Sequence, residues 1–425
     1  MHKPFLSLLV PTIASVALAC SLYLANTPTA NAAPPLSLYE VIDTVRSNHP
    51  QILEQLARIR STEQNLRAIE SQSLPSFSVD AGARTRDQSG ASLTASMPLV
   101  TFGKLESQLD AAREEIAVER ARLVQIEAQA VERAALLFVN FLGYEGKLIA
   151  ATLSLNEQSN LLRRLERRFG SGYTSGSDLR TVRTRVQQAQ SRLNDLRLRA
   201  QETSDELSVL LNRPIEDLVP LNLKRLDAAS PTPDWKSVAA GNAQLNLLRA
   251  QIGLANRQVK EQALSDRSTL SLVGQQPFTE SGTDRFRVGL ELSYNYNNLG
   301  AQNMAKVDQL RALVTAKEQE LEQSMREIEI RYKSLLSNIR TAETVSIPLT
   351  KKLIEGLEEN TLSLDRLYQA GRKSLFEVIN TYRELSDARI QLAEFETDRL
   401  IKRISLLALT GQLKTLHRPE GQVKP

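Results

Sequence analysis

The chain has 425 residues but only one cysteine, Cys20, and three histidines. A single cysteine cannot form an intramolecular disulfide, so disulfides do not hold the fold together. The histidines (His2, His49 and His417) are too scattered in sequence to predict a metal site or a general base. The glycine-rich stretch at residues 170–176 follows no predicted strand and does not match a phosphate-binding loop. We therefore expect no catalytic residues, no cofactor and no metal, and hence no enzyme.

Aromatic residues make up only 5% of the chain, which is low for a globular enzyme. After residue 33, no apolar run approaches the roughly 20 residues that a membrane-spanning helix needs. The formal net charge of +4 is small and spread over a long chain, so nucleic acid is not an expected partner. If this protein crosses a membrane, we expect it to do so with strands.

The first 33 residues have the features of a signal peptide. Lys3 gives a short positive start, residues 5–24 are largely apolar, and Ala30 and Ala32 offer a small-residue cleavage site. An alternative is lipid modification of Cys20, which follows a run of small and apolar residues. Both interpretations predict export.

Two parts of the chain resemble each other at a distance of about two hundred residues. Residues 169–182 align without a gap with residues 368–381, which places Gly172 on Gly371. A second match, between residues 49–52 and 242–245, lies upstream. We interpret these matches as two copies of one substructure. The predicted organisation is a signal peptide (1–33), a first repeat (34–232), a second repeat (233–415) and a C-terminal tail (416–425).

Each repeat is dominated by segments whose apolar residues recur every three or four positions, as in coiled coils. The longest segment would reach about 100 Å if it is one continuous helix. Pro348 interrupts its counterpart in the second repeat. The predicted helices cover residues 36–72, 103–168 and 179–212 in the first repeat and residues 235–266, 301–367 and 378–410 in the second.

Four short segments instead alternate apolar and polar residues with a period of two, which is typical of strands. They form one predicted hairpin in each repeat, over residues 76–99 and 269–296. Residues 270–275 give the weakest of the four signals. Such segments are typical of the wall of an outer-membrane barrel, although two amphipathic hairpins on a soluble protein are the alternative. Because a small barrel needs about eight strands, four strands would require two to four copies of the chain.

Together with a signal peptide, the repeated order of helix, hairpin, long helix, glycine turn and helix resembles the TolC family of outer-membrane channel-tunnels. The residues that carry the resemblance are 74–82, 96–104, 167–179 and 368–393. It covers almost the whole chain after the signal peptide, and residues 368–393 are its most specific part. The second strand-to-helix corner, residues 293–300, departs from the family because it lacks a proline.

The resemblance implies a mainly helical protein with a small β part. In it, a homotrimer shares a transmembrane barrel of twelve strands and a long periplasmic tunnel of helices. It implies a passive exit duct in the outer membrane, in contact with outer-membrane lipid. The partners would be a periplasmic adaptor protein and an inner-membrane pump of the ABC or RND type. Type I protein secretion and multidrug efflux both use such a duct, and the C-terminal motif slightly favours secretion. The alternative is a soluble periplasmic coiled-coil scaffold or adaptor without a pore.

The two glycine turns are the polar clusters of most interest. We expect Gly172 and Gly371 to adopt a positive φ at a turn between helices. Ser175 and Ser374 lie three residues before an acidic residue, which is the spacing of a helix N-cap.

The resemblance also places a gate at these turns, with candidate residues Asp178, Tyr368, Lys373, Glu377 and Asn380. Lys373 and Tyr368 would tether Asp178 across helices and keep the entrance shut. Glu377 and Asn380 match two positions that are acidic in the family. Because Asn380 is uncharged, we expect a weaker carboxylate ring here.

Four arginines crowd the end of the first long helix: Arg163, Arg164, Arg167 and Arg168. A solvated helix face is the simpler interpretation, and a substrate-binding patch is the alternative.

Overall fold

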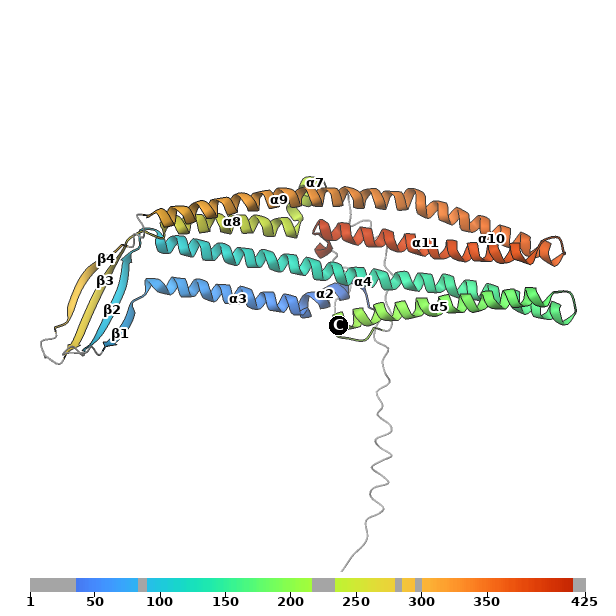
Figure 1. Cartoon of the computed structure of the whole chain (residues 1–425), viewed down its shortest axis with the longest axis horizontal. Helices are drawn as coiled ribbons and strands as arrows, with labels where there is room; N and C mark the ends of the chain where they lie inside the picture. Colours follow the sequence, from blue (N-terminus) through green and yellow to red (C-terminus); the bar gives the residue numbers. More distant parts are fainter. Residues whose placement is uncertain (1–35, 83–89, 216–233, 280–284, 295–299, 416–425) are drawn as a thin grey trace, which may run out of the picture.

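The computed structural model describes residues 36–82, 90–215, 234–279, 285–294 and 300–415. The predicted signal peptide, the C-terminal tail and the tips of both hairpins lie outside these residues. The described part is a long, narrow molecule (Figure 1), with a small sheet at one end and two turns between helices at the other.

The helices repeat in the order that the sequence predicts, with a short pair before each hairpin and a long pair after it. The first repeat contains α2 (Leu38–Asn48), α3 (Pro50–Glu70), the short 3-10 helix η1 (Ser71–Ser73), α4 (Lys104–Gly170) and α5 (Gly176–Leu211). The second contains α7 (Trp235–Gly241), α8 (Ala243–Leu264), α9 (Ala301–Thr341), α10 (Ile347–Gln369), α11 (Leu375–Leu409) and η4 (Gln412–Thr415).

The prediction of single helices over residues 36–72 and 235–266 is wrong, because each is broken once. The breaks fall at His49 (φ −66°, ψ 124°) and Asn242 (φ −72°, ψ 121°), which are equivalent positions in the two repeats. Pro50 follows the first break and suits the first turn of a new helix, where no N–H donor is needed. At the second break, the Asn242 side chain accepts a hydrogen bond of 3.1 Å from the N–H of Leu245. Two different residue types therefore produce the same bend.

The interruption expected at Pro348 is present as the π-helical segment η3 (Ala342–Ser346) between α9 and α10. Proline has no N–H and disturbs the preceding turn of a helix. A wider π turn accommodates this without ending the rod. The second rod therefore continues through Pro348 with a change of pitch.

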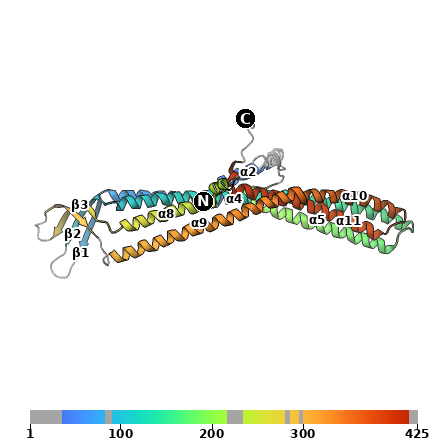
Figure 2. The same ribbon diagram turned by 90° about the horizontal axis from the view of Figure 1, so that it is seen from above.

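The half-length helices stack end to end against the long rods (Figures 1 and 2). Toward the sheet, α4 packs against α3 and α8, and α8 packs against α9. Toward the turns, α4 packs against α5 and α11, and α11 packs against α10. The result is a bundle that keeps a similar width along its length.

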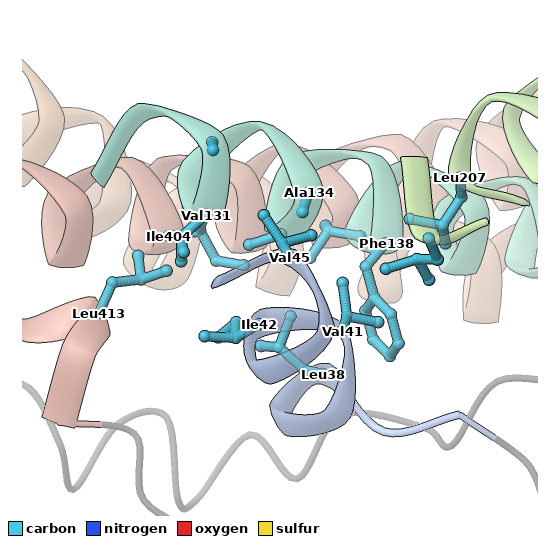
Figure 3. Close-up of a cluster of buried hydrophobic side chains, with 14 of the residues drawn as sticks. Leu38, Val41, Ile42, Val45, Val131, Ala134, Phe138, Leu207, Ile404 and Leu413 are labelled. Atoms are coloured by element: carbon cyan, nitrogen blue, oxygen red, sulfur yellow. The ribbon is translucent and has the colours of Figure 1, made fainter. Parts of the chain in front are cut away.

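A buried cluster holds the middle of the bundle, where the half-length helices meet (Figure 3). Val41 and Val45 of α2 face Phe138 of α4, and Leu207 of α5 and Ile404 of α11 complete the contact. All five side chains are at most 1% exposed. Burial of such side chains stabilises the fold by about 1.5–3 kcal/mol each. This cluster therefore fixes where the part of the bundle toward the sheet joins the part toward the turns.

Among the described residues, α4 is the one helix long and apolar enough, by length and composition alone, to cross a membrane. The amino-acid sequence after residue 33 predicts no such segment. Within the chain, α4 lies at the centre of the bundle, in contact with α3, α5, α8 and α11. This packing accounts for its apolar composition, as in the core helix of any bundle.

The hairpins form one antiparallel sheet of four strands in the order β1-β2-β3-β4. The strands are β1 (Ser76–Gly82), β2 (Gly90–Val100), β3 (Thr269–Thr279) and β4 (Arg287–Ser293). The two hairpins pair with each other through β2 and β3. The weak signal at residues 270–275 belongs to β3, which is as long as β2.

The pairing register places the apolar residues of all four strands on one face. Val79 lies opposite Leu93, Met97 opposite Leu272, and Leu272 opposite Leu290. No other part of the described chain covers this face, since Phe77 is 73% exposed and Val288 is 61% exposed. The opposite face carries mainly small polar residues on β1 and β2: Ser76, Ser78, Asp80, Ser92, Thr94 and Ser96.

Candidate functional site at the helical tip

The helical tip, defined here by the turns between α4 and α5 and between α10 and α11, is built twice with the same hydrogen bonds. In the first turn, Gly172 has a φ of +78° and its N–H donates to the Phe169 carbonyl at 3.0 Å. In the second, Gly371 has a φ of +72° and its N–H donates to the Tyr368 carbonyl at 2.9 Å. Both positive φ values confirm the expectation from sequence. Because glycine has no Cβ, it adopts this conformation without strain.

Each turn is followed by a capped helix. The Ser175 hydroxyl accepts a hydrogen bond of 3.1 Å from the N–H of Asp178, and the Ser374 hydroxyl accepts one of 3.3 Å from the N–H of Glu377. Both serines are extended, as an N-cap residue must be. The predicted caps are therefore confirmed, and they fix where α5 and α11 begin.

A buried cluster lies directly behind the turns and holds the four helices together. Leu161 and Leu165 of α4 meet Val182 of α5 and Val378 of α11, and Tyr368 of α10 packs against them. Each of the four aliphatic side chains is at most 2% exposed. This tightly packed hydrophobic cluster therefore supports the turns that carry the polar groups of the tip.

Lys373 and Glu377 pair with each other, four residues apart in the chain. Lys373 Nζ lies 2.8 Å from Glu377 Oε2, and the Ser374 hydroxyl lies 3.2 Å from Glu377 Oε1. The hydrogen bond from Lys373 is the main reason that the pKa of Glu377 lies below its ordinary value, and the Ser374 hydroxyl adds to it. Within this chain, Lys373 lies in the turn before α11 and pairs with the first turn of that helix, not with another helix.

The other candidate gate residues lie on the same tip but are not joined to Lys373. Tyr368 stacks with Arg168, whose guanidinium carbon lies 5.3 Å from the ring centre. Asp178 is half-buried in the first turn of α5, and Asn380 is half-buried in the second turn of α11. The structure thus brings all five candidates to one end of the molecule, and the interaction of Asp178 with Lys373 and Tyr368 remains a prediction.

Two ion-pair groups join the helices behind the tip, and the sequence analysis did not predict either. Arg164 of α4 lies 3.0 Å from Asp365 of α10. Farther along the bundle, Arg389 of α11 contacts Glu157 of α4 at 2.9 Å and Glu358 of α10 at 2.7 Å.

The side chain of Arg389 is only 13% exposed. Burial by itself lowers the pKa of this guanidinium, but the hydrogen bonds to Glu358 and Glu157 outweigh it and raise the pKa above the ordinary value. Arg389 therefore stays charged and fastens α11 to both long rods.

Nothing at the tip has the arrangement of a catalytic or metal centre. Within the described ranges, no three His, Cys, Asp or Glu side chains come together in a way that could hold a metal ion. The tip offers hydrogen bonds, ion pairs and surface charge.

The family model for the outer membrane efflux protein matches residues 41–213, all of which lie within the first repeat. No curated protein sequence gives a significant match.

Solved structures match over the whole architecture. The chain is 15% identical to CusC, whose structures concern transmembrane channel formation, with a TM-score of 0.78 over 88% of this chain and 92% of that one. It is 14% identical to the outer membrane protein VceC of Vibrio cholerae, with a TM-score of 0.75 over 88% of this chain and 96% of that one. It is 16% identical to the MtrE outer membrane channel of Neisseria gonorrhoeae, with a TM-score of 0.73 over 88% of this chain and 89% of that one. At these identities, the likeness shows a shared fold.

Proposed function

We propose that this chain, whose residues 41–213 match the family model for the outer membrane efflux protein, belongs to that family. We further propose that three copies form one channel through the outer membrane. In this proposal the channel is a passive exit duct. Its helical tip points into the periplasm and meets an adaptor protein, which connects it to an inner-membrane pump.

The observation that carries the proposal is the four-stranded sheet. Its order, β1-β2-β3-β4, leaves both β1 and β4 with an unpaired edge, and one of its faces is apolar and uncovered. Soluble proteins rarely leave such edges and faces open. A closed barrel removes the edges, and lipid covers the apolar face. Three copies would supply twelve strands, enough for a barrel that encloses a channel.

The long helices support the same arrangement. Leu349 and Leu353 lie one turn apart on α10 and are 65% and 50% exposed. Ile149 and Leu153 of α4 show the same spacing on another exposed stripe. Stripes with a period of about four residues are typical of helices that pack against further helices. In the proposed trimer, helices of neighbouring copies cover them.

We further propose that the helical tip is the gate. Tyr368, Lys373, Glu377, Asn380 and Asp178 would lie around the closed entrance, where the two turns of each copy meet those of its neighbours. Water screens exposed ion pairs at such a place and keeps each of them weak. A gate closed by weak contacts can open when an adaptor binds, because binding needs to outweigh only a few of them.

Cell fractionation distinguishes this proposal from the alternative of a soluble periplasmic scaffold. The channel is expected to float with outer-membrane vesicles, to resist alkaline extraction and to conduct ions after purification in detergent. Release of the full-length protein as a soluble species by alkali would contradict the proposal. The uncovered apolar face of the sheet is the reason for expecting the first result.

A further inference from the structure

The helical tip and the helix ends next to it carry an excess of positive charge. The 21 residues centred on Gly172 (162–182) and the 21 centred on Gly371 (361–381) contain eight Lys or Arg and four Asp or Glu, a difference of +4. The whole chain of 425 residues also has a net charge of +4. The rest of the chain is therefore neutral in sum, and the net charge of the molecule is concentrated at one end.

Ion pairs neutralise most of the carboxylates of these two segments. Asp365 pairs with Arg164 at 3.0 Å, Glu377 with Lys373 at 2.8 Å, and Glu166 with Arg183 at 3.3 Å. This leaves Asp178 as the carboxylate of these segments for which the described residues supply no cation within 4.0 Å.

Most of the arginines, in contrast, have no carboxylate partner among the described residues. One of them, Arg168, is half-buried and stacked on Tyr368, while the other five are exposed at the surface of the tip. The set is Arg163, Arg167, Arg168, Arg180, Arg366 and Arg372.

These charges act on the entrance wherever each side chain points. A helix with its side chains is about 10–12 Å across. The Debye length is about 10 Å at 0.1 M salt and longer at lower salt. At salt concentrations well below about 0.1 M, a charge on the outer side of a tip helix therefore also acts on its inner side. Three copies would bring about eighteen such arginines around one opening.

From this distribution we propose that the periplasmic entrance is electropositive and that the channel passes anions in preference to cations. This inference rests on the proposed function, since it needs a conducting trimer. A positively charged mouth raises the local concentration of anions, by an amount that grows as the salt concentration falls. The class of solute that this entrance favours is therefore anionic.

The test is the reversal potential of purified trimers in planar bilayers that separate two KCl solutions differing about tenfold in concentration. The concentrations are centred on about 0.05 M, where screening of charges is weak. We expect the potential of a channel that prefers Cl⁻ to K⁺. In the triple variant R163Q, R167Q and R180Q, the Cl⁻/K⁺ permeability ratio is expected to fall by about threefold or more. All three arginines are exposed, so the fold is expected to tolerate their replacement.

A matched control removes the same number of charges far from the tip. Arg60 and Arg67 of α3 and Arg197 of α5 are also exposed and have no ion pair with a described residue. The variant R60Q, R67Q and R197Q is expected to keep the permeability ratio of the original protein. A preference for K⁺ in the original protein, or an equal effect of both triple variants, would overturn the inference and leave the channel itself intact. Trimers that conduct no ions at all would contradict the proposed function and, with it, this inference.

Discussion

Gly170 and Gly172 lie two residues apart in the same turn, yet the backbone needs glycine at only one of them. Gly172 has a positive φ, whereas Gly170 is the last residue of α4 and does not. A Cβ added at either position would meet no atom within 4 Å. Any difference between alanine substitutions at the two sites therefore comes from the backbone and not from packing.

We predict that Gly172→Ala destabilises the tip by about 1–2 kcal/mol, the cost of a left-handed conformation for a residue with a Cβ. Gly170→Ala is the control and is expected to be neutral or slightly stabilising, since alanine favours a helix over glycine. Thermal unfolding followed by far-UV circular dichroism checks both variants. Equal midpoints for G170A and G172A would contradict the assignment of the turn.

The proposed gate leads to a second prediction for single residues. In the double variant Lys373→Ala and Tyr368→Phe, the entrance loses the ammonium group and the hydroxyl group that are proposed to hold Asp178. We expect a larger single-channel conductance in planar bilayers, because fewer contacts keep the turns together. Glu359→Gln, an exposed change on α10 outside the proposed gate, is the control and should leave the conductance unaltered. If the double variant conducts like the original protein, the tether does not hold the gate shut.

At the scale of elements, the sheet offers two neighbouring residues that face opposite sides. Phe77 belongs to the apolar face and Ser78 to the polar face of β1, and both are exposed in the single chain. A lysine on the lipid face of a barrel costs about 2–4 kcal/mol near the middle of the bilayer and less near its edges. A lysine facing the interior meets water.

We therefore predict that Phe77→Lys reduces the amount of protein assembled in the outer membrane, while Ser78→Lys does not. The measurement is the yield of assembled protein in outer-membrane fractions at equal expression. A similar yield for F77K and S78K would mean that the apolar face does not face lipid.

The sequence predicted most of the elements because their signals are local. The hairpins were expected over residues 76–99 and 269–296, and the described strands begin at Ser76 and Thr269. Serine caps and glycine turns were recognised because both depend on spacings of a few residues.

The features that the sequence analysis missed have two causes. The breaks at His49 and Asn242 do have local signals, a proline in one repeat and a capping asparagine in the other, but the continuous apolar pattern outweighed them. The contacts of Arg389 with Glu157 have no local signal, since the two residues are 232 positions apart. Only the packing of α11 against α4 brings them together.

On the scale of the whole molecule, one repeated unit produces two very different ends. At one end, the two hairpins join into a sheet that cannot cover its own apolar face. At the other, the two turns form a tip with exposed arginines, and a buried hydrophobic cluster lies behind it. Between them, stacked half-length helices hold the ends far apart, with α4 alone about 100 Å long. An uncovered sheet at the end of a rigid rod is understandable if several copies share it.

The central claim, that three copies join their sheets edge to edge, predicts contact between β1 of one copy and β4 of the next. Cysteines can report this contact, since the chain has one cysteine of its own, Cys20, within the predicted signal peptide. A cysteine at Ser78 would be combined in turn with one at each of four positions along β4: Arg287, Gly289, Glu291 and Ser293. A disulfide forms only where the Cα atoms come within about 7 Å.

The decisive measurement is the size of the products after mild oxidation of these double variants in outer-membrane fractions, separated without reducing agent. We expect at least one β4 position to give covalent dimers and trimers, with no larger product, because a closed ring of three has no free edge. The single variants, each with one cysteine, should give no such series. Monomers at every position, or a ladder that continues beyond the trimer, would contradict the claim.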